Sequence, residues 1–290
     1  MSPADNLSAT IRRVASRGEP ALVAFLTAGY PSRDRFREHL QAVAAGADVV
    51  EIGVPFTDPM ADGVTIQRSS HAALAQGVSL RWILSELDSL RRGNGSGATA
   101  ASGITAAASG IAAPSGIAAA SDIAAAGTAT PILLMSYLNP LLAFGLERLA
   151  DAAVRAGVSG FIVPDLPFDE ANELHGLLSA RGLALVQMVT PVTKPDRMKL
   201  LCENSQGFVY AVTMTGTTGK HVSVPAEVLS YLDAVRSVSA APVCAGFGIR
   251  NREQVELLKG HVDGVVIGSA LVEVLERGED PAKWLRALRG

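Results

Sequence analysis

The sequence predicts a (β/α)8 barrel, and three observations support this fold class. Apolar runs that suit strands alternate with longer segments that suit helices, and together they make eight strand–helix units. The runs are continuously apolar rather than alternating, which is typical of parallel strands buried on both faces. The units fill about 250 residues once one unusual segment is set aside, which is the usual length of such a barrel. A doubly wound open sheet is the second possibility, but no Gly-x-Gly-x-x-Gly motif follows the first strand.

The first units come after an extra N-terminal helix at 5–17, where Ile11 and Val14 share one side. A buried strand follows at 21–27 and is ended by a glycine and by Pro31. The same patterns predict a helix at 32–45, a strand at 48–54 and helices at 63–76 and 79–92.

The alternation resumes at Pro131 and continues to the end of the chain. Each predicted strand is a short apolar run, each predicted helix is longer and amphipathic, and glycine or proline marks many boundaries. The predicted strands are 132–137, 160–163, 183–189, 207–212, 241–245 and 263–267. The predicted helices are 144–156, 169–181, 194–204, 225–238 and 250–259, with further helical segments at the end.

Residues 93–130 interrupt the pattern between the helical part of the second unit and the third strand. They are rich in Gly, Ala, Ser and Thr, and Asp122 is their only charged residue. Short repeats that begin at Ser102, Ser109, Ser115 and Ser121 leave a small solenoid as an alternative. Because each repeat offers one Ile to bury and Gly and Pro interrupt any helix, we expect a flexible insertion within one domain spanning 1–290. This connection belongs to the N-terminal face of a barrel, away from the chemistry.

The composition argues against several classes of function. The net charge of −3 comes from nearly balanced acids and bases without a basic stripe, so nucleic acid is not an expected partner. Neither a signal pattern nor an apolar run of about 18 residues is present, so we expect a cytoplasmic protein with no membrane partner. Cys202 and Cys244 are far apart in apolar contexts and are expected to be reduced core residues. No His, Asp or Glu spacing indicates a metal site.

Two acids stand out near the second predicted strand. Glu51 lies inside the apolar run 49–54, and Asp62 follows in the next loop, after Pro55 and Pro59. A charged and unpaired carboxylate costs several kcal/mol to desolvate, so an acid in such a run indicates a chemical role. The alternative is an acid at a strand end that pairs with a neighbouring base.

Other unusual residues follow the strands at the end of the barrel where catalysis occurs. Tyr137 ends the third strand, Asp165 follows the fourth, and Tyr210 lies in the sixth. The loop 213–224 is long and contains glycines and hydroxyl groups, which suits a lid over a ligand, although an ordinary surface loop is the alternative. His221 in this loop is a weaker candidate for ligand contact, and the other histidines indicate nothing specific.

Glycines follow the seventh and eighth strands, at 246–249 (Gly-Phe-Gly-Ile) and at 268–269 (Gly-Ser). Glycine lets backbone N–H groups approach an anion closely, and the N-terminus of a helix adds a positive dipole. Because these two loops form the recurrent phosphate site of barrel enzymes, the sequence predicts a phosphate-binding site here.

With these residues assembled, the chain resembles the tryptophan synthase alpha subunit family. The most specific motif is Glu51–Gln67, Glu-Ile-Gly-Val-Pro-Phe-Thr-Asp-Pro-Met-Ala-Asp-Gly-Val-Thr-Ile-Gln. It is supported by Phe25–Pro31, Leu134–Asn139, Pro164–Pro167, Tyr210, Thr217–Gly219, Gly246–Ile249 and Gly268–Ser269. The resemblance covers nearly everything from Ala21 to the end except 93–130.

The resemblance implies a lyase of tryptophan biosynthesis that cleaves indole-3-glycerol phosphate to indole and glyceraldehyde 3-phosphate in a retro-aldol reaction. It implies that Glu51 is the general acid and base and that Asp62 accepts the indole N–H. It further implies that Phe25 and Tyr210 shape the site and that Thr218 positions Asp62. The implied substrate-binding residues are Phe25, Tyr137, Tyr210, Thr218, Gly219, Gly246, Phe247, Gly248, Ile249, Gly268 and Ser269, of which Gly219, Gly248, Gly268 and Ser269 hold the phosphate.

The resemblance also implies a partner. Family members form a heterotetramer of two alpha and two beta subunits, in which indole passes to a beta subunit that carries pyridoxal phosphate, so no cofactor is expected in this chain. The loop carrying Asp58 and the segment around Asn139 resemble the surfaces that meet that subunit. Two features depart from the family pattern. One is the insertion at 93–130. The other is the sequence of the loop after the sixth strand, which bears on how fast the lid closes. A stand-alone indole lyase and an inactive allosteric scaffold are alternatives, but the intact Glu51 and Asp62 weigh against the scaffold.

Overall fold

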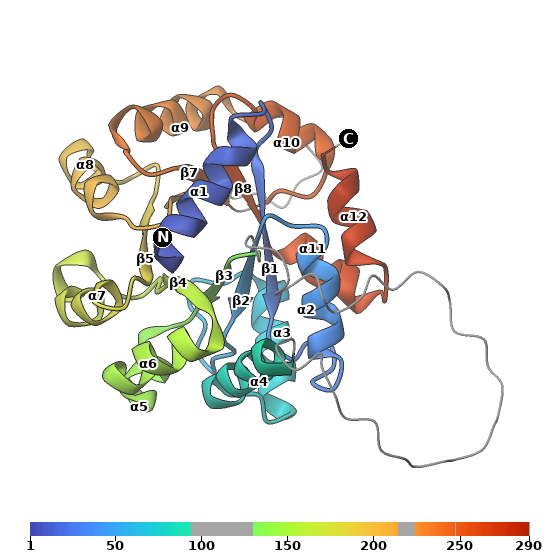
Figure 1. Ribbon diagram of the computed structural model, residues 1–290. Coiled ribbons are helices and arrows are strands. Elements are labelled where there is room, and N and C mark those ends of the chain that lie inside the picture. The colour runs from blue at the N-terminus through green and yellow to red at the C-terminus, as the bar shows by residue number, and fades with distance from the viewer. Residues whose placement is uncertain (94–129, 214–223, 247, 290) are drawn as a thin grey trace, which may run out of the picture.

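Eight parallel strands close into a barrel in which each strand pairs with its sequence neighbours and β8 pairs with β1 (Figure 1). The computed structural model describes residues 1–93, 130–213, 224–246 and 248–289. Within these ranges the strands are β1 Ala21–Thr27, β2 Val49–Gly53, β3 Ile132–Met135, β4 Val158–Ile162, β5 Ala184–Val189, β6 Val209–Val212, β7 Val243–Gly246 and β8 Gly264–Ile267. The predicted (β/α)8 barrel is therefore confirmed.

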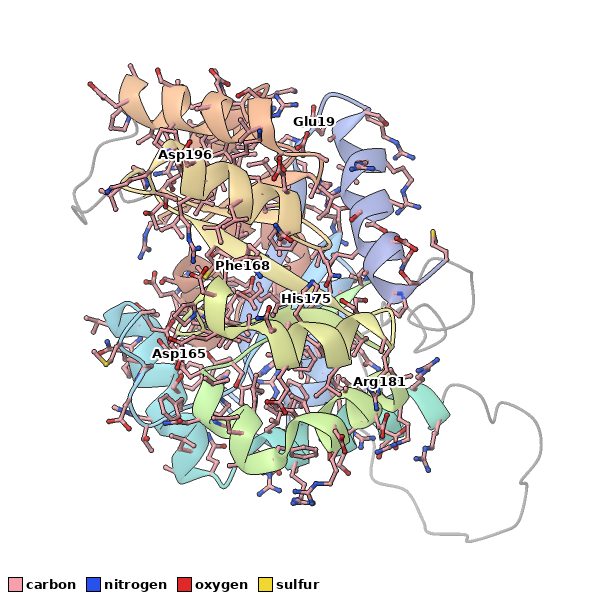
Figure 2. All side chains as sticks on the ribbon, turned by 90° about the vertical axis from the view of Figure 1, so that its left-hand side faces the viewer. Glu19, Asp165, Phe168, His175, Arg181 and Asp196 are labelled. Atoms are coloured by element: carbon pink, nitrogen blue, oxygen red, sulfur yellow. The ribbon has the colours of Figure 1, made fainter. Side chains whose placement is uncertain are left out.

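Helices surround the barrel on the outside (Figure 1). The described helices are α1 Pro3–Ala15, α2 Phe36–Ala44, α3 Val64–Ala75, α4 Leu80–Gly93, α5 Leu138–Phe144, α6 Leu146–Ala156, η2 Phe168–Glu170, α7 Asn172–Ser179, α8 Pro195–Asn204, α9 Ala226–Val238, α10 Arg252–Leu258, α11 Ser269–Glu276 and α12 Pro281–Ala287. Figure 2 shows α7 and α8 covering one side, with His175 and Asp196 on the outer surface. None of the helices in the described part of the chain is long and apolar enough to span a bilayer.

Two layers of apolar side chains hold the barrel together. One cluster lies between the strands and the outer helices and contains Val50 and Ile52 of β2. The other fills the barrel interior and contains Val49 of the same strand. Because side chains alternate along a strand, Glu51 faces the interior, on the same side as Val49.

The N-terminal helix closes the bottom of the barrel. Leu7, Ile11 and Val14 of α1 belong to the interior cluster. The helix begins earlier than the sequence pattern predicts because Ser2 and Asp5 form a reciprocal capping box. The opposite end, where the strands terminate, is the end at which barrels of this kind carry their active sites.

The third unit differs from the prediction. β3 ends at Met135, so the prediction that Tyr137 ends the strand is wrong. Tyr137 instead precedes α5, a short helix that the sequence analysis missed. Asp165, after β4, accepts a hydrogen bond at 2.9 Å from the backbone N–H of Leu138, which satisfies one of the free donors at the start of this helix.

Two predicted features fall largely outside the described residues. Between Gly93 at the end of α4 and Ile132 at the start of β3, residues 94–129 are not described. The same holds for 214–223 in the long loop after β6. The expectations for the insertion 93–130 and for the lid therefore remain predictions.

Candidate active site

Glu51 lies inside the barrel near the end of β2. It is aligned with Phe25 of β1 and with Leu133 of β3, so it is bounded by neighbours on both sides. Its exposed fraction is 1%. A Cβ atom at Gly53, the next interior position of β2, would lie 2.4 Å from Cζ of Phe25. Gly53 therefore leaves room for the Phe25 ring, a role that the sequence analysis did not assign.

Burial decides the protonation of Glu51. Desolvation, with a smaller contribution from the charge of Asp62, raises the pKa of Glu51 to about 8. The Oε2 atom of Glu51 has no hydrogen-bond partner among the described residues. A carboxyl group in this environment is mostly protonated at neutral pH and is available as a proton donor.

Asp62 lies in the loop between β2 and α3 and is partly exposed. Burial raises the pKa of Asp62 to about 6, and a hydrogen bond from Tyr137 partly opposes that rise. At neutral pH Asp62 is therefore mostly ionised while Glu51 is mostly protonated. Two carboxyl groups in opposite protonation states can act as a proton donor and as a stabiliser of positive charge.

Tyr137 connects the Asp62 loop to β3. Its hydroxyl group donates to Asp62 and accepts from the backbone N–H of Ala61 at 2.9 Å. Its ring stacks on Phe56, with 5.1 Å between the ring centroids. The structure thus places Tyr137 against the loop of Asp62, where its geometry suits holding Asp62 in place.

Helix α3 holds the same loop from the other side. Nε2 of Gln67 donates to the backbone carbonyl of Asp62 at 2.9 Å, and Nε2 of His71 lies 3.2 Å from the carbonyl oxygen of Thr57. The sequence analysis missed both contacts. Gln67 ends the most specific motif, which was the only signal pointing to it.

Tyr210 enters the site from β6. It is buried, and burial followed by the charge of Glu51 raises its pKa well above the usual value. A Cβ atom at Gly246 would lie 2.4 Å from the Tyr210 hydroxyl oxygen. Gly246 is therefore required by packing against Tyr210, in addition to any role toward a ligand.

The loops after β7 and β8 lie at the same end of the barrel. Gly248 has a φ of 85°, a conformation that favours glycine, and Ile249 is buried beside it. Gly268 precedes α11, which begins at Ser269. A Cβ atom at Gly268 would lie 4.0 Å from atoms of Phe25, so this loop faces the same ring that lies beside Glu51. This arrangement suits an anion at the start of α11.

Some predicted site residues are not placed. Thr218, Gly219 and Phe247 lie outside the described residues. The structure brings together the described members at the C-terminal end of the barrel: Phe25, Glu51, Asp62, Tyr137, Tyr210, Gly246, Gly248, Ile249, Gly268 and Ser269. In the described part of the chain no group of three or more His, Cys, Asp or Glu side chains is arranged to hold a metal ion.

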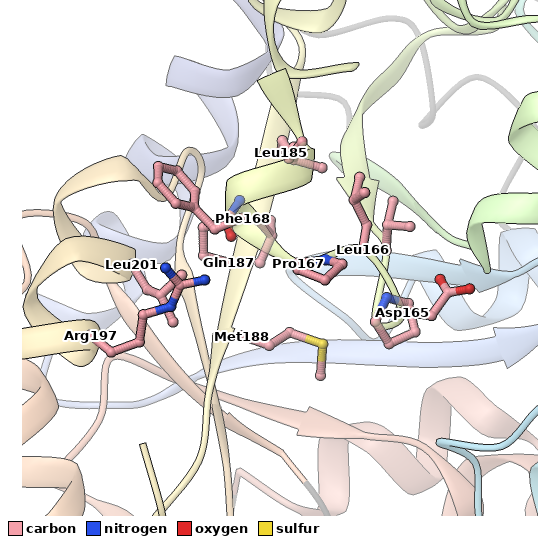
Figure 3. Close-up of a pocket in the computed structure, with 13 residues that line it drawn as sticks. Asp165, Leu166, Pro167, Phe168, Leu185, Gln187, Met188, Arg197 and Leu201 are labelled. Carbon is pink, nitrogen blue, oxygen red and sulfur yellow. The ribbon is translucent and has the colours of Figure 1, made fainter. Parts of the chain in front are cut away.

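A cavity of about 290 Å³ lies among β5, α8 and the loop after β4 (Figure 3). It is lined by the outward-facing residues Leu185 and Gln187 of β5, by the loop after β4, and by Arg197 of α8. Arg197 pairs with Asp169 through an Nη1–Oδ1 contact of 2.9 Å. Val186 and Met188, on the interior side of β5, also line this cavity, whereas Glu51 and Asp62 do not.

Comparison with known proteins identifies the family. The model of the family "Tryptophan synthase alpha chain" matches residues 11–97 and 97–288. A tryptophan synthase alpha chain from Nitratidesulfovibrio vulgaris (strain DP4) is 40% identical over 285 residues, which cover 98% of both chains. One from Carboxydothermus hydrogenoformans is 37% identical over 262 residues, covering 90% of this chain and 85% of the relative.

Solved structures agree with the sequence comparison. Tryptophan synthase from M. tuberculosis in an aminoacrylate-bound form superposes with a TM-score of 0.77 at 27% identity, covering 98% of each chain. The tryptophan synthase alpha chain of Legionella pneumophila subsp. pneumophila gives a TM-score of 0.75 at 27% identity, covering 99% of this chain and 94% of that one.

Proposed function

Because this chain belongs to the tryptophan synthase alpha chain family, we propose that Glu51 and Asp62 carry out the chemistry of that family. The chain is a lyase of tryptophan biosynthesis, EC 4.2.1.20, which cleaves indole-3-glycerol phosphate to indole and glyceraldehyde 3-phosphate. The observation that carries the assignment is the fully buried Glu51, with its pKa raised to about 8, beside the partly exposed and mostly ionised Asp62.

Glu51 acts first as an acid. Its carboxyl group gives a proton to C3 of the indole ring, and the ring becomes a positively charged indolenine. Asp62 accepts the hydrogen bond from the indole N–H and stabilises this charge, since an ionised group placed where charge develops lowers the barrier. The high pKa of Glu51 keeps the donor protonated, and the lower pKa of Asp62 keeps the acceptor ionised.

Glu51 acts next as a base. Its carboxylate takes the proton of the 3′-hydroxyl group of the glycerol chain, and the O–H electron pair forms the aldehyde C=O. The bond between C3 and the glycerol carbon breaks, and its electron pair restores the neutral indole ring. Glu51 regains the proton that it gave in the first step, so one carboxyl group serves both steps.

The remaining site residues bind the two ends of the substrate. Phe25 and Tyr210 enclose the indole ring, and Tyr137 holds Asp62 toward it. Gly248, Gly268 and Ser269 offer backbone N–H groups to the phosphate at the start of α11, beside Gly246 and Ile249. This assignment is supported by the proximity of Gly268 to Phe25 and by the positive φ of Gly248, which glycine adopts without strain. Thr218, Gly219 and Phe247 would complete the enclosure; they lie outside the described residues.

The test is indole release by Glu51→Gln and Asp62→Asn variants. We expect each to lower kcat by about 10²–10⁴-fold, the usual contribution of a positioned acid or base. Glu173→Gln, which changes an exposed acid of α7, is the matched control and is expected to keep wild-type turnover. Circular dichroism checks that the variants are folded. Near-normal turnover in Glu51→Gln would contradict the mechanism.

We further propose that the chain works in the cytoplasm as part of a heterotetramer of two alpha and two beta subunits, with pyridoxal phosphate in the beta subunit and no cofactor here. The surface around exposed Asp58 and Asn139 would meet the partner, and the neighbouring exposed apolar residues Met60 (92%) and Leu142 (52%) support this. Indole release measured with and without a beta subunit tests it. Activation on mixing supports the complex, and full activity alone supports a stand-alone lyase.

The domain organisation belongs to the same proposal. Residues 1–290 form a single barrel domain, and 93–130 is an insertion on the face opposite the catalytic centre. The closure of the bottom of the barrel by α1 and the junction of the insertion with the start of β3 support this placement.

A further inference from the structure

Two carboxylates near the end of α11 have partners that the mechanism does not use. Glu273 and Glu276 lie in the last turn of the helix, which contains no basic residue. The C-terminal end of a helix carries a partial negative charge and favours bases, so two acids there are locally unfavourable. Besides Arg277, which directly follows the helix, side chains from other elements compensate these charges.

Glu276 binds two elements at once. Its Oε1 atom accepts a hydrogen bond from the hydroxyl group of Tyr30, which follows β1. Its Oε2 atom accepts from Nη2 of Arg68 on α3 at 2.6 Å. The carboxylate therefore joins α11 to the β1 loop and to the helix that follows Asp62.

Glu273, three residues earlier, makes a second set of contacts. Arg250 donates to both of its oxygen atoms, at 2.9 Å and 3.0 Å. A hydrogen bond from the side chain of Thr65 also reaches Glu273. Thr65 lies three residues after Asp62, and Arg250 directly follows Ile249 in the loop after β7. Glu273 therefore joins α11 to the Asp62 segment and to one of the two phosphate loops.

Apolar contacts lie beneath these polar ones. Phe25, Tyr30, Ile66 and Val272 form a small buried cluster of their own. Ile66 belongs to α3 and Val272 to α11, so the two helices meet through this cluster as well as through Arg68 and Glu276. The cluster includes Phe25, the ring beside Glu51 and Gly268.

We propose that Glu276, assisted by Glu273, is a positioning residue that sets Asp62 relative to the phosphate bound at the start of α11. The inference rests on the function proposed above for Asp62 and for the loop of Gly268 and Ser269. Both helices begin beside reacting groups, because α3 starts two residues after Asp62 and α11 starts at Ser269. The cross-links join the first two turns of α3 to the last turn of α11, and because α11 is only eight residues long they restrain its start relative to the Asp62 segment.

The effect is expected on the reaction more than on folding. The ion pair is half exposed, with 56% exposure of the Arg68 side chain and 29% of Glu276, and such pairs add little stability. The body of α3 is held separately, because the hydroxyl groups of Ser69 and Thr27 are hydrogen bonded at 2.6 Å in the core. A variant at Glu276 should therefore fold while its Asp62 segment loses alignment.

Glu276→Gln tests the inference in the full-length protein. We expect kcat for indole release to fall about tenfold, since misplacement of a reacting group by an ångström can cost up to about a hundredfold. The KM for indole-3-glycerol phosphate and the Kd for inorganic phosphate should change less than about twofold, because the first turn of α11 is intact. Glu279→Gln is the matched control, because Glu279 pairs with its neighbour Arg277 and is expected to leave all three values unchanged.

A double-mutant cycle separates positioning from a general structural effect. Arg68→Gln should lower kcat as Glu276→Gln does, the two together should add little to either, and Arg68→Lys should recover part of the loss. Additive effects on kcat, or a Glu276→Gln variant that behaves like Glu279→Gln, would overturn the inference. If Glu276→Gln does not fold, the inference is tested by the Arg68 variants alone: a wild-type kcat in Arg68→Gln would overturn it.

The same assay distinguishes the two proposals. Activity retained by Glu51→Gln or Asp62→Asn removes the premise, whatever Glu276→Gln does. If those variants are inactive and Glu276→Gln has wild-type kcat, only the positioning role fails.

Discussion

Glu51 and Asp62 are both carboxylic acids, but the protein holds them in different ways. Glu51 belongs to a strand that is paired on both sides and has an exposed fraction of 1%. Asp62 belongs to a loop and is kept in place by side chains, chiefly Tyr137 and Gln67. The strand holds the Glu51 carboxyl group where water does not reach it, whereas the loop leaves the Asp62 carboxyl group partly exposed and able to shift its position. The difference explains how two similar groups come to have pKa values near 8 and near 6.

The largest effect should come from changing side-chain length at the two positions. Glu51→Asp withdraws the carboxyl group by one methylene from a strand that cannot follow, so we expect kcat to fall about 100-fold. Asp62→Glu lengthens a side chain on a loop that can adjust, so we expect a fall of about tenfold. Steady-state indole release measures both. Equal losses at the two positions would mean that the strand and the loop hold their acids with similar rigidity.

The pH dependence of kcat should show the titration of both Asp62 and Glu51. Activity needs ionised Asp62 and protonated Glu51, so kcat should rise with pH through about 6 and decline through about 8. One pH unit below the acidic limb the rate should be about tenfold lower, as for a single required ionisation. Asp62→Asn should remove the acidic limb from its residual activity and leave the basic limb. A flat profile between pH 5 and 9 would contradict these protonation states.

A smaller effect is expected from Tyr137→Phe. The substitution removes the hydrogen bond to Asp62 and the acceptor for the backbone N–H of Ala61. The hydrogen bond lowers the pKa of Asp62, so its loss should move the acidic limb of the pH profile upward, and kcat at pH 7 should fall about fivefold, equivalent to about one hydrogen bond. Tyr231→Phe, on α9, is a suitable control because it removes a buried hydroxyl group that packs between the strands and the outer helices. An unchanged acidic limb in Tyr137→Phe would show that Tyr137 does not hold Asp62.

The smallest effect should follow deletion of Gly95–Gly127. The insertion joins α4 to the start of β3, whereas the two proposed catalytic acids lie in the second half of β2 and in the loop after it. We therefore expect kcat and KM to remain within about twofold of wild type, because chemistry in this fold occurs at the other face of the barrel. Loss of catalysis in a soluble deletion variant would show that the insertion reaches the site.

The fold and the first acid could be predicted because each depends on local pattern. Continuous apolar runs indicate strands buried on both faces, and an acid within such a run is conspicuous. The helix α5 was missed because Pro140 suggests a break, although proline is tolerated in the first turn of a helix. Tyr137 was assigned to the strand for a different reason. Its position depends on the start of α5, where the backbone N–H of Leu138 donates to Asp165 of the next unit, a contact that no local pattern records.

The sequence by itself determined the barrel, the place of Glu51 in a buried strand and the glycine loops, because periodicity and residue type act over a few neighbouring residues. The resemblance to a family gave Asp62 its expected role. Only the tertiary structure decided which groups surround Asp62 and how α11 is joined to α3, because Glu276 and Arg68 are separated by 208 residues and meet only when β8 closes on β1. Barrel closure brings such distant residues together, and no local pattern records the pairing.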